Sequence, residues 1–453
     1  MSISTDGHAA SSPSRQGTSG RSAGIRLDAT TLLIVYVCLL VLLPARLVIS
    51  FLPIAVTPAM ILGAVALAWW FNARLVAGLG VATGWQPVRY FGLLFLAAIL
   101  LSYAYAYFRP IGADASSGAD RNLVVMAAMV GITVLAADGI RDRGRLDLLI
   151  RMFVGMTVAI AMLGVLQFFT GVDIVSWVQL PGLRPVFDFN LIGERSDFRR
   201  PAGTATHSIE YGVVLATALP LAMHYAFYAQ GRRSIVLRWA GVVIIGAALL
   251  MSLSRSAILG AMGVGLMLFF TWSRRRRVRA LLILPVFLAA MRLLVSGLIG
   301  TLLGLFANVS SDPSYTGRTE DYPAAFRAFS ESKLIGQGFG TFPMLLDNQY
   351  LGLLIETGIV GFTVVLGGFL VTIFTARGAR LRSSEPFDRD LAQALAASVV
   401  VPLIAFATFD ALAFPMFTGV TFLCVGLCGA AWRFAWGEDR GHQEVNMSSA
   451  AAR

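Results

Sequence analysis

The chain alternates between long apolar stretches and short polar connections over almost its whole length. Each apolar stretch approaches or exceeds the roughly 20 residues that a helix needs to cross the hydrocarbon core of a bilayer. The pattern predicts an all-α, polytopic integral membrane protein with about 12 transmembrane helices, at residues 30–51, 54–72, 90–107, 122–137, 146–169, 208–228, 239–253, 256–272, 280–305, 349–375, 391–411 and 414–435.

Composition supports this fold class. Of the 453 residues, 57% are hydrophobic and 13% are charged, whereas a soluble domain has about 45–50% apolar and about 25% charged residues. Cys38, Cys424 and Cys428 all lie inside apolar stretches. Two thiols without a nearby histidine or carboxylate make a poor metal site. We therefore expect no disulfide framework and no metal or other cofactor.

The net charge of +11 comes mainly from arginines in short connections. Basic residues favour the cytoplasmic side. With the N-terminus inside, the cytoplasmic connections contain Arg74, Arg89, Arg141, Arg143, Arg145, Arg232, Arg233, Arg238, Arg274 to Arg277, Arg279, Arg377, Arg380, Arg382 and Arg389. This orientation explains the positive charge without a nucleic-acid partner, and an even number of spans returns the C-terminus to the cytoplasm.

The same pattern divides the chain into segments. We expect a disordered cytoplasmic tail at 1–29, nine transmembrane helices at 30–305 with a periplasmic loop at 170–207, a large periplasmic loop at 306–348, three more transmembrane helices at 349–435, and a cytoplasmic tail at 436–453.

Arginines also gather on the predicted periplasmic side, against the usual bias. The first loop contains Arg184, Arg195, Arg199 and Arg200, the second contains Arg318 and Arg327, and Arg255 lies in a tight turn at 252–256. Solvated loop charge or lipid contact explains a single arginine well. A group around two loops and a turn favours an anion site.

Arg292 is a separate signal within the ninth apolar stretch. It lies about twelve residues into the stretch, which is roughly 18 Å deep at the rise of a helix. A buried arginine costs about 3 kcal/mol or more unless it faces a partner or a wet cavity. We expect Arg292 to point into a polar pocket. The alternative is that the second half of this stretch lies in the external layer.

Short motifs line up on the predicted periplasmic side. RPAGTATHSIEYG at 200–212 enters the sixth helix, and SRSAILG at 254–260 enters the eighth. GRTEDYPAAFRAFSESKLIGQGFGTF at 317–342 is followed by DNQYLGLLIETG at 347–358. Together they resemble the superfamily of O-antigen ligases and polymerases, which are bacterial membrane glycosyltransferases. That family shows an Arg-x-x-Gly stretch, a Ser-Arg turn and a long external loop ending in a His-Asn or Asp-Asn pair.

The resemblance implies a C-type glycosyltransferase architecture with the large periplasmic loop between helices 9 and 10. It also implies a donor glycan on polyprenyl pyrophosphate and a reaction without metal, in the bacterial inner membrane. Arginine suits a pyrophosphate leaving group, because it is always charged and binds phosphate in bidentate fashion. We assign Arg255 and Arg318 as catalytic, and Arg199, Arg200, His207, Arg292, Arg327, Asn348 and Tyr350 as substrate-binding.

Asp347 is the candidate general base for the acceptor hydroxyl. Partial desolvation at the membrane boundary raises the pKa of a carboxyl group, and adjacent arginines lower it. The alternative role is an N-cap of the tenth helix, since aspartate is a favoured cap. In ligases of the family this position is typically histidine, and Asp-Asn resembles the exopolysaccharide polymerases.

Glu356 lies nine residues after Asp347, which corresponds to opposite faces of an ideal helix. We therefore expect a structural role, as the buried partner of an arginine such as Arg292. A helix at 319–332 is expected to dock through Phe326 and Phe329. The glycine-rich stretch 336–340 follows no strand and predicts a tight turn near the substrate.

The leading functional prediction is a polysaccharide polymerase that joins lipid-linked repeat units. The first alternative is an O-antigen ligase that transfers glycan to lipid A–core. A transporter of lipid-linked sugars is a further alternative, although no inverted repeat or matching pair of broken helices is evident. Expected partners are the lipid-linked donor, the glycan or lipid A–core acceptor, the bilayer and a chain-length regulator.

Overall fold

The computed structural model describes residues 28–52, 54–76, 82, 84–186, 192–195, 198–307, 322–342 and 346–451, with side chains as far as 437 and without that of Arg195. These residues form mainly α-helices: α1 (Ala29–Val41), α2 (Pro58–Leu75), α3 (Pro87–Ala106), α4 (Ala113–Gly139), α5 (Arg143–Thr170), α6 (Ser208–Phe227), α7 (Arg232–Met251), α8 (Arg255–Thr271), α9 (Arg274–Leu294), α10 (Leu298–Ala307), α12 (Tyr322–Glu331), α13 (Gln349–Arg382), α14 (Pro386–Ala405) and α15 (Pro415–Ala451). The predicted 1–29 tail lies almost wholly outside the described residues.

Long, mostly apolar helices dominate the structure, as expected of a polytopic membrane protein. A helix occurs at each of the twelve predicted positions. By length and composition, seven of the described helices are able to cross a membrane, or eight if the bent pair α9 and α10 counts as one span. The prediction of twelve spans is therefore not confirmed as a number.

Several helix boundaries differ from the prediction for identifiable reasons. α1 ends at Val41 instead of continuing to residue 51, since Pro44 follows and the residue before a proline avoids helical geometry. Helices α2, α3 and α14 begin at a proline, whose missing N–H costs nothing in the first turn. The last helix continues to Ala451, so much of the expected 436–453 tail is helical.

The ninth apolar stretch is not one straight span. α9 already begins within the arginine run, because arginine is a good helix former. It ends at Leu294, and α10 continues after a bend of 111° near Gly297, which has φ +86°. Arg292 therefore lies in the last turn of α9 and is exposed, so the expectation that it is buried in a polar pocket is wrong.

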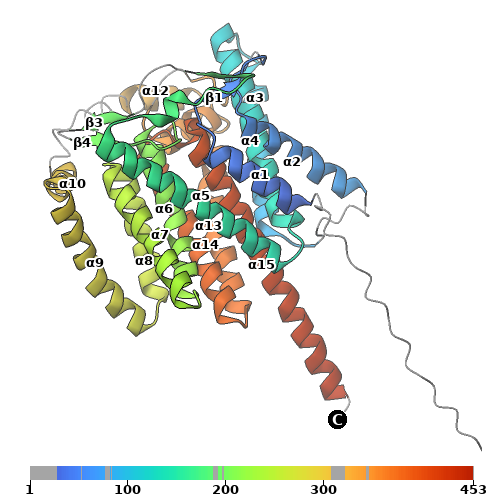
Figure 1. Ribbon diagram of the computed structural model, residues 1–453. Helices are drawn as coiled ribbons and strands as arrows, with labels where there is room; N and C mark the ends of the chain where they lie inside the picture. Colours follow the sequence, from blue (N-terminus) through green and yellow to red (C-terminus); the bar gives the residue numbers. More distant parts are fainter. Residues whose placement is uncertain are drawn as a thin grey trace, which may run out of the picture.

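Short strands and helices gather at one end of the helical bundle (Figure 1), which we call the loop end. Strand β1 (Leu47–Ile49) pairs antiparallel with β2 (Leu183–Pro185), and β3 (Gly193–Arg195) pairs with β4 (Phe198–Arg200). Helices α10 and α12 lie at the same end. The predicted periplasmic loops thus fold together, with small sheets that the all-α prediction omitted.

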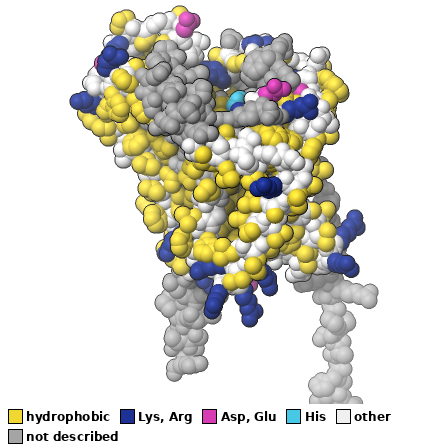
Figure 2. Space-filling view, turned by 90° about the vertical axis from the view of Figure 1, so that its left-hand side faces the viewer, with side chains coloured by type: hydrophobic (Ala, Val, Ile, Leu, Met, Phe, Trp, Pro, Cys, Tyr) yellow, Lys and Arg dark blue, Asp and Glu magenta, His cyan; other side chains and the backbone are white. Residues whose placement is uncertain are grey.

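Basic side chains gather at the opposite end, which we call the arginine end, and an apolar band separates the two ends (Figure 2). Ion pairs join helices at the arginine end. The buried Asp138 of α4 accepts hydrogen bonds from Trp70 and Arg74 of α2 and from Arg89 of α3, at 2.8–3.0 Å. Paired in this way, the buried carboxylate holds three helices together.

The bundle centre is formed by helices that are buried along most of their length. In α4 the most apolar 18-residue window is 72% buried, and in α15 it is 83% buried. Small residues allow close helix contacts: a Cβ built on Gly131 of α4 would overlap the Gly63 carbonyl of α2. Such small-residue contacts are typical of helix packing in membranes, where dispersion replaces the hydrophobic effect.

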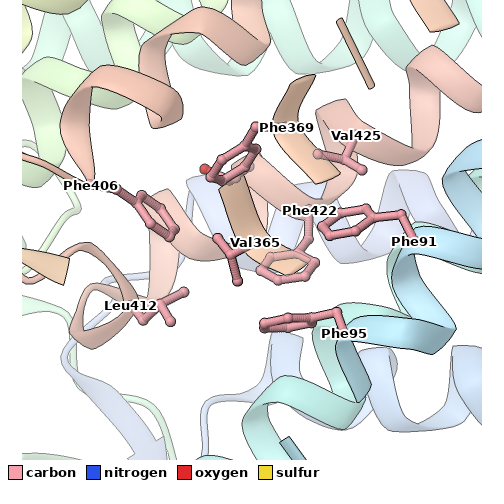
Figure 3. A pocket seen from close by; sticks show the side chains of 9 residues that line it. Phe91, Phe95, Val365, Phe369, Phe406, Leu412, Phe422 and Val425 are labelled. Atoms are coloured by element: carbon pink, nitrogen blue, oxygen red, sulfur yellow. The ribbon is translucent and has the colours of Figure 1, made fainter. Parts of the chain in front are cut away.

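A small apolar cavity is buried between α3, α13, α14 and α15 (Figure 3). It is lined by Phe91, Phe95, Val365, Phe369, Phe406, Leu412, Thr421, Phe422 and Val425. Its volume of about 10 Å³ is close to the least that one water molecule needs. Among the described residues the Thr421 hydroxyl has no hydrogen-bond partner. A single hydroxyl is too few partners for a water, so the cavity is a dry packing gap.

Candidate functional site at the loop end

Arg199 and Arg200 are neighbours on β4 but diverge, because successive side chains of a strand point to opposite faces. Arg199 is exposed and donates to the Phe169 carbonyl at the end of α5, at 3.4 Å. The Arg200 Nε donates to the Ser252 carbonyl at 3.4 Å. Arg200 therefore faces the turn between α7 and α8, whereas Arg199 covers the end of α5.

The turn between α7 and α8 places Arg255 at the start of α8. Leu253 has φ +49°, which reverses the chain sharply, and Ser254 caps α8 by accepting from the Ala257 N–H at 3.3 Å. Because Arg200 bonds the carbonyl of Ser252, the RPAG stretch and the Ser-Arg turn meet in space. Two of the sequence motifs are thus brought together.

His207 is the N-cap of α6, and its Nδ1 accepts from the Ile209 N–H at 3.1 Å. This bond leaves the ring proton on Nε2. His207 retains exposed surface, but the surrounding protein and the charge of Arg200 lower its pKa to about 4, against the opposite effect of Asp347. At neutral pH His207 is therefore an uncharged donor and not a base.

Asp347 is not the cap of α13. The cap is Asn348, whose side chain accepts from the Leu351 N–H at 3.2 Å. Asp347 precedes it in a left-handed conformation, with φ +48°, and is exposed. A helix cap has extended geometry, so the backbone assigns the cap to Asn348 and not to Asp347.

Asp410 is a further carboxylate near Asp347, and the sequence analysis missed it. It lies between α14 and the 3-10 helix η4 (Ala411–Ala413), where the sequence predicted a continuous span. Gln349, two residues after Asp347, holds the segment around Asp410: the Gln349 N–H donates to the Phe409 carbonyl at 3.3 Å, and its side chain accepts from the Leu412 N–H at 2.8 Å. Burial and the charge of Asp347 raise the pKa of Asp410 to about 6.

Glu356 lies beside a break in α13. Gly358 has φ +65° and ψ −167°, so the helix kinks there. The Glu356 carboxylate accepts backbone hydrogen bonds from Gly340 and Phe342 and lies within electrostatic range of Asp410. The structural role is consistent with the prediction, but its expected pairing with Arg292 is wrong.

The glycine-rich stretch fills the break in α13. The N–H groups of Gln337 and Gly338 donate to the Ile355 and Glu356 carbonyls at 2.8 and 3.0 Å. In return the Ile359 N–H donates to the Lys333 carbonyl at 2.9 Å. The broken helix therefore finds new partners for its freed backbone groups in the loop, as buried backbone requires.

Other predicted site residues lie apart from this group or outside the described residues. Arg318 belongs to the latter, so its role stays a prediction. Arg327 is exposed on α12. Tyr350 donates to the Leu403 carbonyl at 2.9 Å and thereby joins α13 to α14. Phe329 packs against Leu346 and Ile355 as expected, but Phe326 is 57% exposed, so its predicted docking is wrong.

The described residues hold no group of three or more His, Cys, Asp or Glu that could bind a metal ion. The site combines Arg200, His207, Asp347 and Asp410, and the turn that Arg200 contacts leads into Arg255 at the start of α8. Cations and carboxylates thus converge where three helix ends and a turn meet. This arrangement suits a phosphate-containing substrate and a proton acceptor.

Residues 240–366 match the family model for O-antigen ligase. The matched segment contains both the turn with Arg255 and the pair Asp347–Asn348. Over this segment the chain is similar to the O-antigen ligases, which supports the superfamily of O-antigen ligases and polymerases. No match is found among the curated proteins. Arg200 and His207 precede the matched segment in the sequence, but the fold brings Arg200 to the Ser252 carbonyl and His207 into electrostatic range of Asp347.

Proposed function

We propose that the protein transfers a glycan from polyprenyl pyrophosphate to a sugar hydroxyl at the periplasmic face of the bacterial inner membrane, polymerising surface polysaccharide repeat units. The meeting of Arg200 with the Ser252–Arg255 turn, beside His207 and Asp347, carries this proposal. The match of residues 240–366 to the O-antigen ligase family model supports a glycan-transfer role. The loop end is then periplasmic, and both chain ends are cytoplasmic.

In the proposed reaction, the acceptor oxygen forms a bond to the anomeric carbon of the donor while the bond from that carbon to pyrophosphate breaks. Asp347 accepts the proton of the acceptor hydroxyl. The negative charge departs on the pyrophosphate, where Arg200 and Arg255 stabilise it in a site of low dielectric. The neutral His207 donates through Nε2–H to a substrate oxygen.

An O-antigen ligase is the second candidate, because the matching family model bears that description. The two functions differ only in the acceptor. Aspartate at position 347, where ligases of the family typically have histidine, favours the polymerase.

Reconstitution tests the function. The purified protein receives its lipid-linked repeat unit alone, and then the same unit with lipid A–core. A ladder of products from the repeat unit alone supports a polymerase, and product that depends on lipid A–core supports a ligase. Absence of product in both, with intact binding of the lipid-linked unit, would overturn glycan transfer in favour of transport.

Asp347→Asn tests the proposed base. Asparagine tolerates the left-handed backbone at this position, so the variant removes the carboxylate and keeps the local fold. We expect turnover to fall by roughly 10²–10⁴-fold, the usual contribution of a general base. Asp114→Asn, an exposed carboxylate in the first turn of α4, is the matched control. Wild-type turnover in Asp347→Asn would refute the assignment.

A further inference from the structure

We propose that Gln167 is a positioning residue for the transfer site: its buried amide holds the backbone of Gly203 and thereby sets the places of Arg200 and His207. This inference rests on the proposed function. Gln167 lies in the last turn of α5 and is fully buried. No motif in the sequence marks it.

The side-chain amide of Gln167 forms two hydrogen bonds with the backbone of Gly203. The Gly203 N–H donates to Gln167 Oε1 at 2.8 Å, and Gln167 Nε2 donates to the Gly203 carbonyl at 3.3 Å. Gln167 Nε2 also lies 3.3 Å from Oδ1 of the buried Asp173. Two opposed hydrogen bonds fix both the position and the orientation of one peptide segment.

The loop around Gly203 has little freedom to move. Gly203 has φ +59°, and a Cβ built on it would lie 2.9 Å from the ring of Tyr211. Tyr211 in turn donates to the Ile160 and Ala161 carbonyls of α5, at 3.3 and 3.2 Å. On its other side, the Thr204 carbonyl accepts from the Ala45 N–H at 2.8 Å. The loop is thus clamped between α5 and the segment after α1.

Arg200 lies three residues before Gly203, and His207 lies four residues after it. Gln167 therefore holds the midpoint of the segment that carries both groups. From this midpoint Arg200 reaches the Ser252 carbonyl, and His207 comes within electrostatic range of Asp347. A displacement of about 1 Å at a positioned group costs roughly 100-fold in rate. Loss of the hydrogen bonds between Gln167 and Gly203 is therefore expected to lower the turnover rate.

The test compares Gln167→Leu, which loses both bonds to Gly203, with Gln167→Glu, which keeps the acceptor for the Gly203 N–H. Thr157→Val is the control, since Thr157 is also buried on α5 and donates only to the Phe153 carbonyl of its own helix. For each full-length variant, amide hydrogen exchange of residues 200–206 and the kcat and KM of glycan transfer are measured after reconstitution.

We expect Gln167→Leu to raise exchange in 200–206 alone and to lower kcat by 10- to 100-fold with KM within about threefold. Gln167→Glu sets a carboxylate against the Gly203 carbonyl and Asp173, so it also lowers kcat, whereas Thr157→Val leaves kcat unchanged. Unchanged exchange in Gln167→Leu, or raised exchange with wild-type kcat, overturns the inference. If the wild-type protein transfers nothing, the proposed function fails, while the exchange data still decide whether Gln167 holds the loop.

Discussion

Adjacent polar residues take different tasks at the start of α13. Asn348 has the extended backbone of a cap and binds the Leu351 N–H. Asp347 has a left-handed backbone and a carboxylate that acts electrostatically on His207 and Asp410. The change in backbone conformation between Asp347 and Asn348 thus separates the capping side chain from the candidate base. The charge of Asp347 also acts on Asp410.

The stability of the protein depends on pH through Asp410. Its folded pKa of about 6 lies above the ordinary value of 3.8, so between about pH 4 and pH 6 the folded state holds a proton that the unfolded state has released. Stability therefore falls as pH rises through this window. Asp410→Asn carries no charge, and the Asp410 side chain makes no cap hydrogen bond.

We expect Asp410→Asn to be more stable than the wild type above pH 6, by at most about 3 kcal/mol, and equally stable near pH 4. Thermal unfolding midpoints in detergent between pH 4 and pH 8 measure the difference. A gap that stays constant across this range, or that is largest near pH 4, contradicts the assigned shift.

At the scale of elements, the break in α13 and the glycine-rich loop are one unit. The loop supplies hydrogen-bond partners to Ile355, Glu356 and Ile359, and α12 packs on the first part of α13 through Ala325 and Phe329. Ser102 of α3 also donates to the Glu356 carbonyl at 2.5 Å. The outer part of α13, which begins beside Asp347, is therefore oriented by the loop as well as by the bundle.

Gly358→Ala tests this unit. A Cβ at Gly358 would overlap the Leu334 carbonyl, and φ +65° with ψ −167° is a conformation that alanine avoids. We expect a loss of about 1–3 kcal/mol of stability, measured as a lower thermal midpoint. Gly367→Ala on the same helix has open space around it, so the control is neutral or gains up to about 1 kcal/mol. Equal midpoints for the two variants would contradict the role of the break.

At the scale of the whole molecule, the two ends of the bundle are built differently. The arginine end is closed by ion pairs, including Arg143 with Asp388, Arg145 with Asp28, and Arg276 with Asp390. The guanidinium of Arg276 also lies over the ring of Phe227. The loop end carries small sheets, short helices and the candidate site. This polarity is what the proposed orientation requires, with the basic end cytoplasmic and the loop end periplasmic.

Cysteine labelling tests this orientation. In a background with Cys38, Cys424 and Cys428 replaced by alanine, single cysteines are introduced at the exposed Lys333 of the loop end and the exposed Arg233 of the arginine end. A membrane-impermeant maleimide is expected to label Lys333→Cys in intact spheroplasts, and Arg233→Cys only after lysis. The reverse pattern would place the loop end in the cytoplasm and refute a periplasmic site.

The sequence by itself determined the positions of the helices and the resemblance to the O-antigen ligase and polymerase superfamily. Hydrophobic stretches predict where helices occur, because a helix satisfies its own backbone and apolar side chains favour lipid. The exact starts of α2, α3 and α14, each at a proline, differ from the predicted ones by a few residues. Arg200, Arg255 and Asp347 lie in recognisable local motifs. The sequence therefore also predicted these residues of the candidate site.

Only the tertiary structure decided which of these residues meet. Arg200 and Ser252 are far apart in sequence, and no local pattern records their contact. Asp410 was hidden because an apolar run conceals the turn that ends α14. The break at Gly358 exists because a distant loop satisfies the freed backbone groups. Local sequence sets the preferences of each segment, but long-range packing and hydrogen bonding choose the partners on which the site depends.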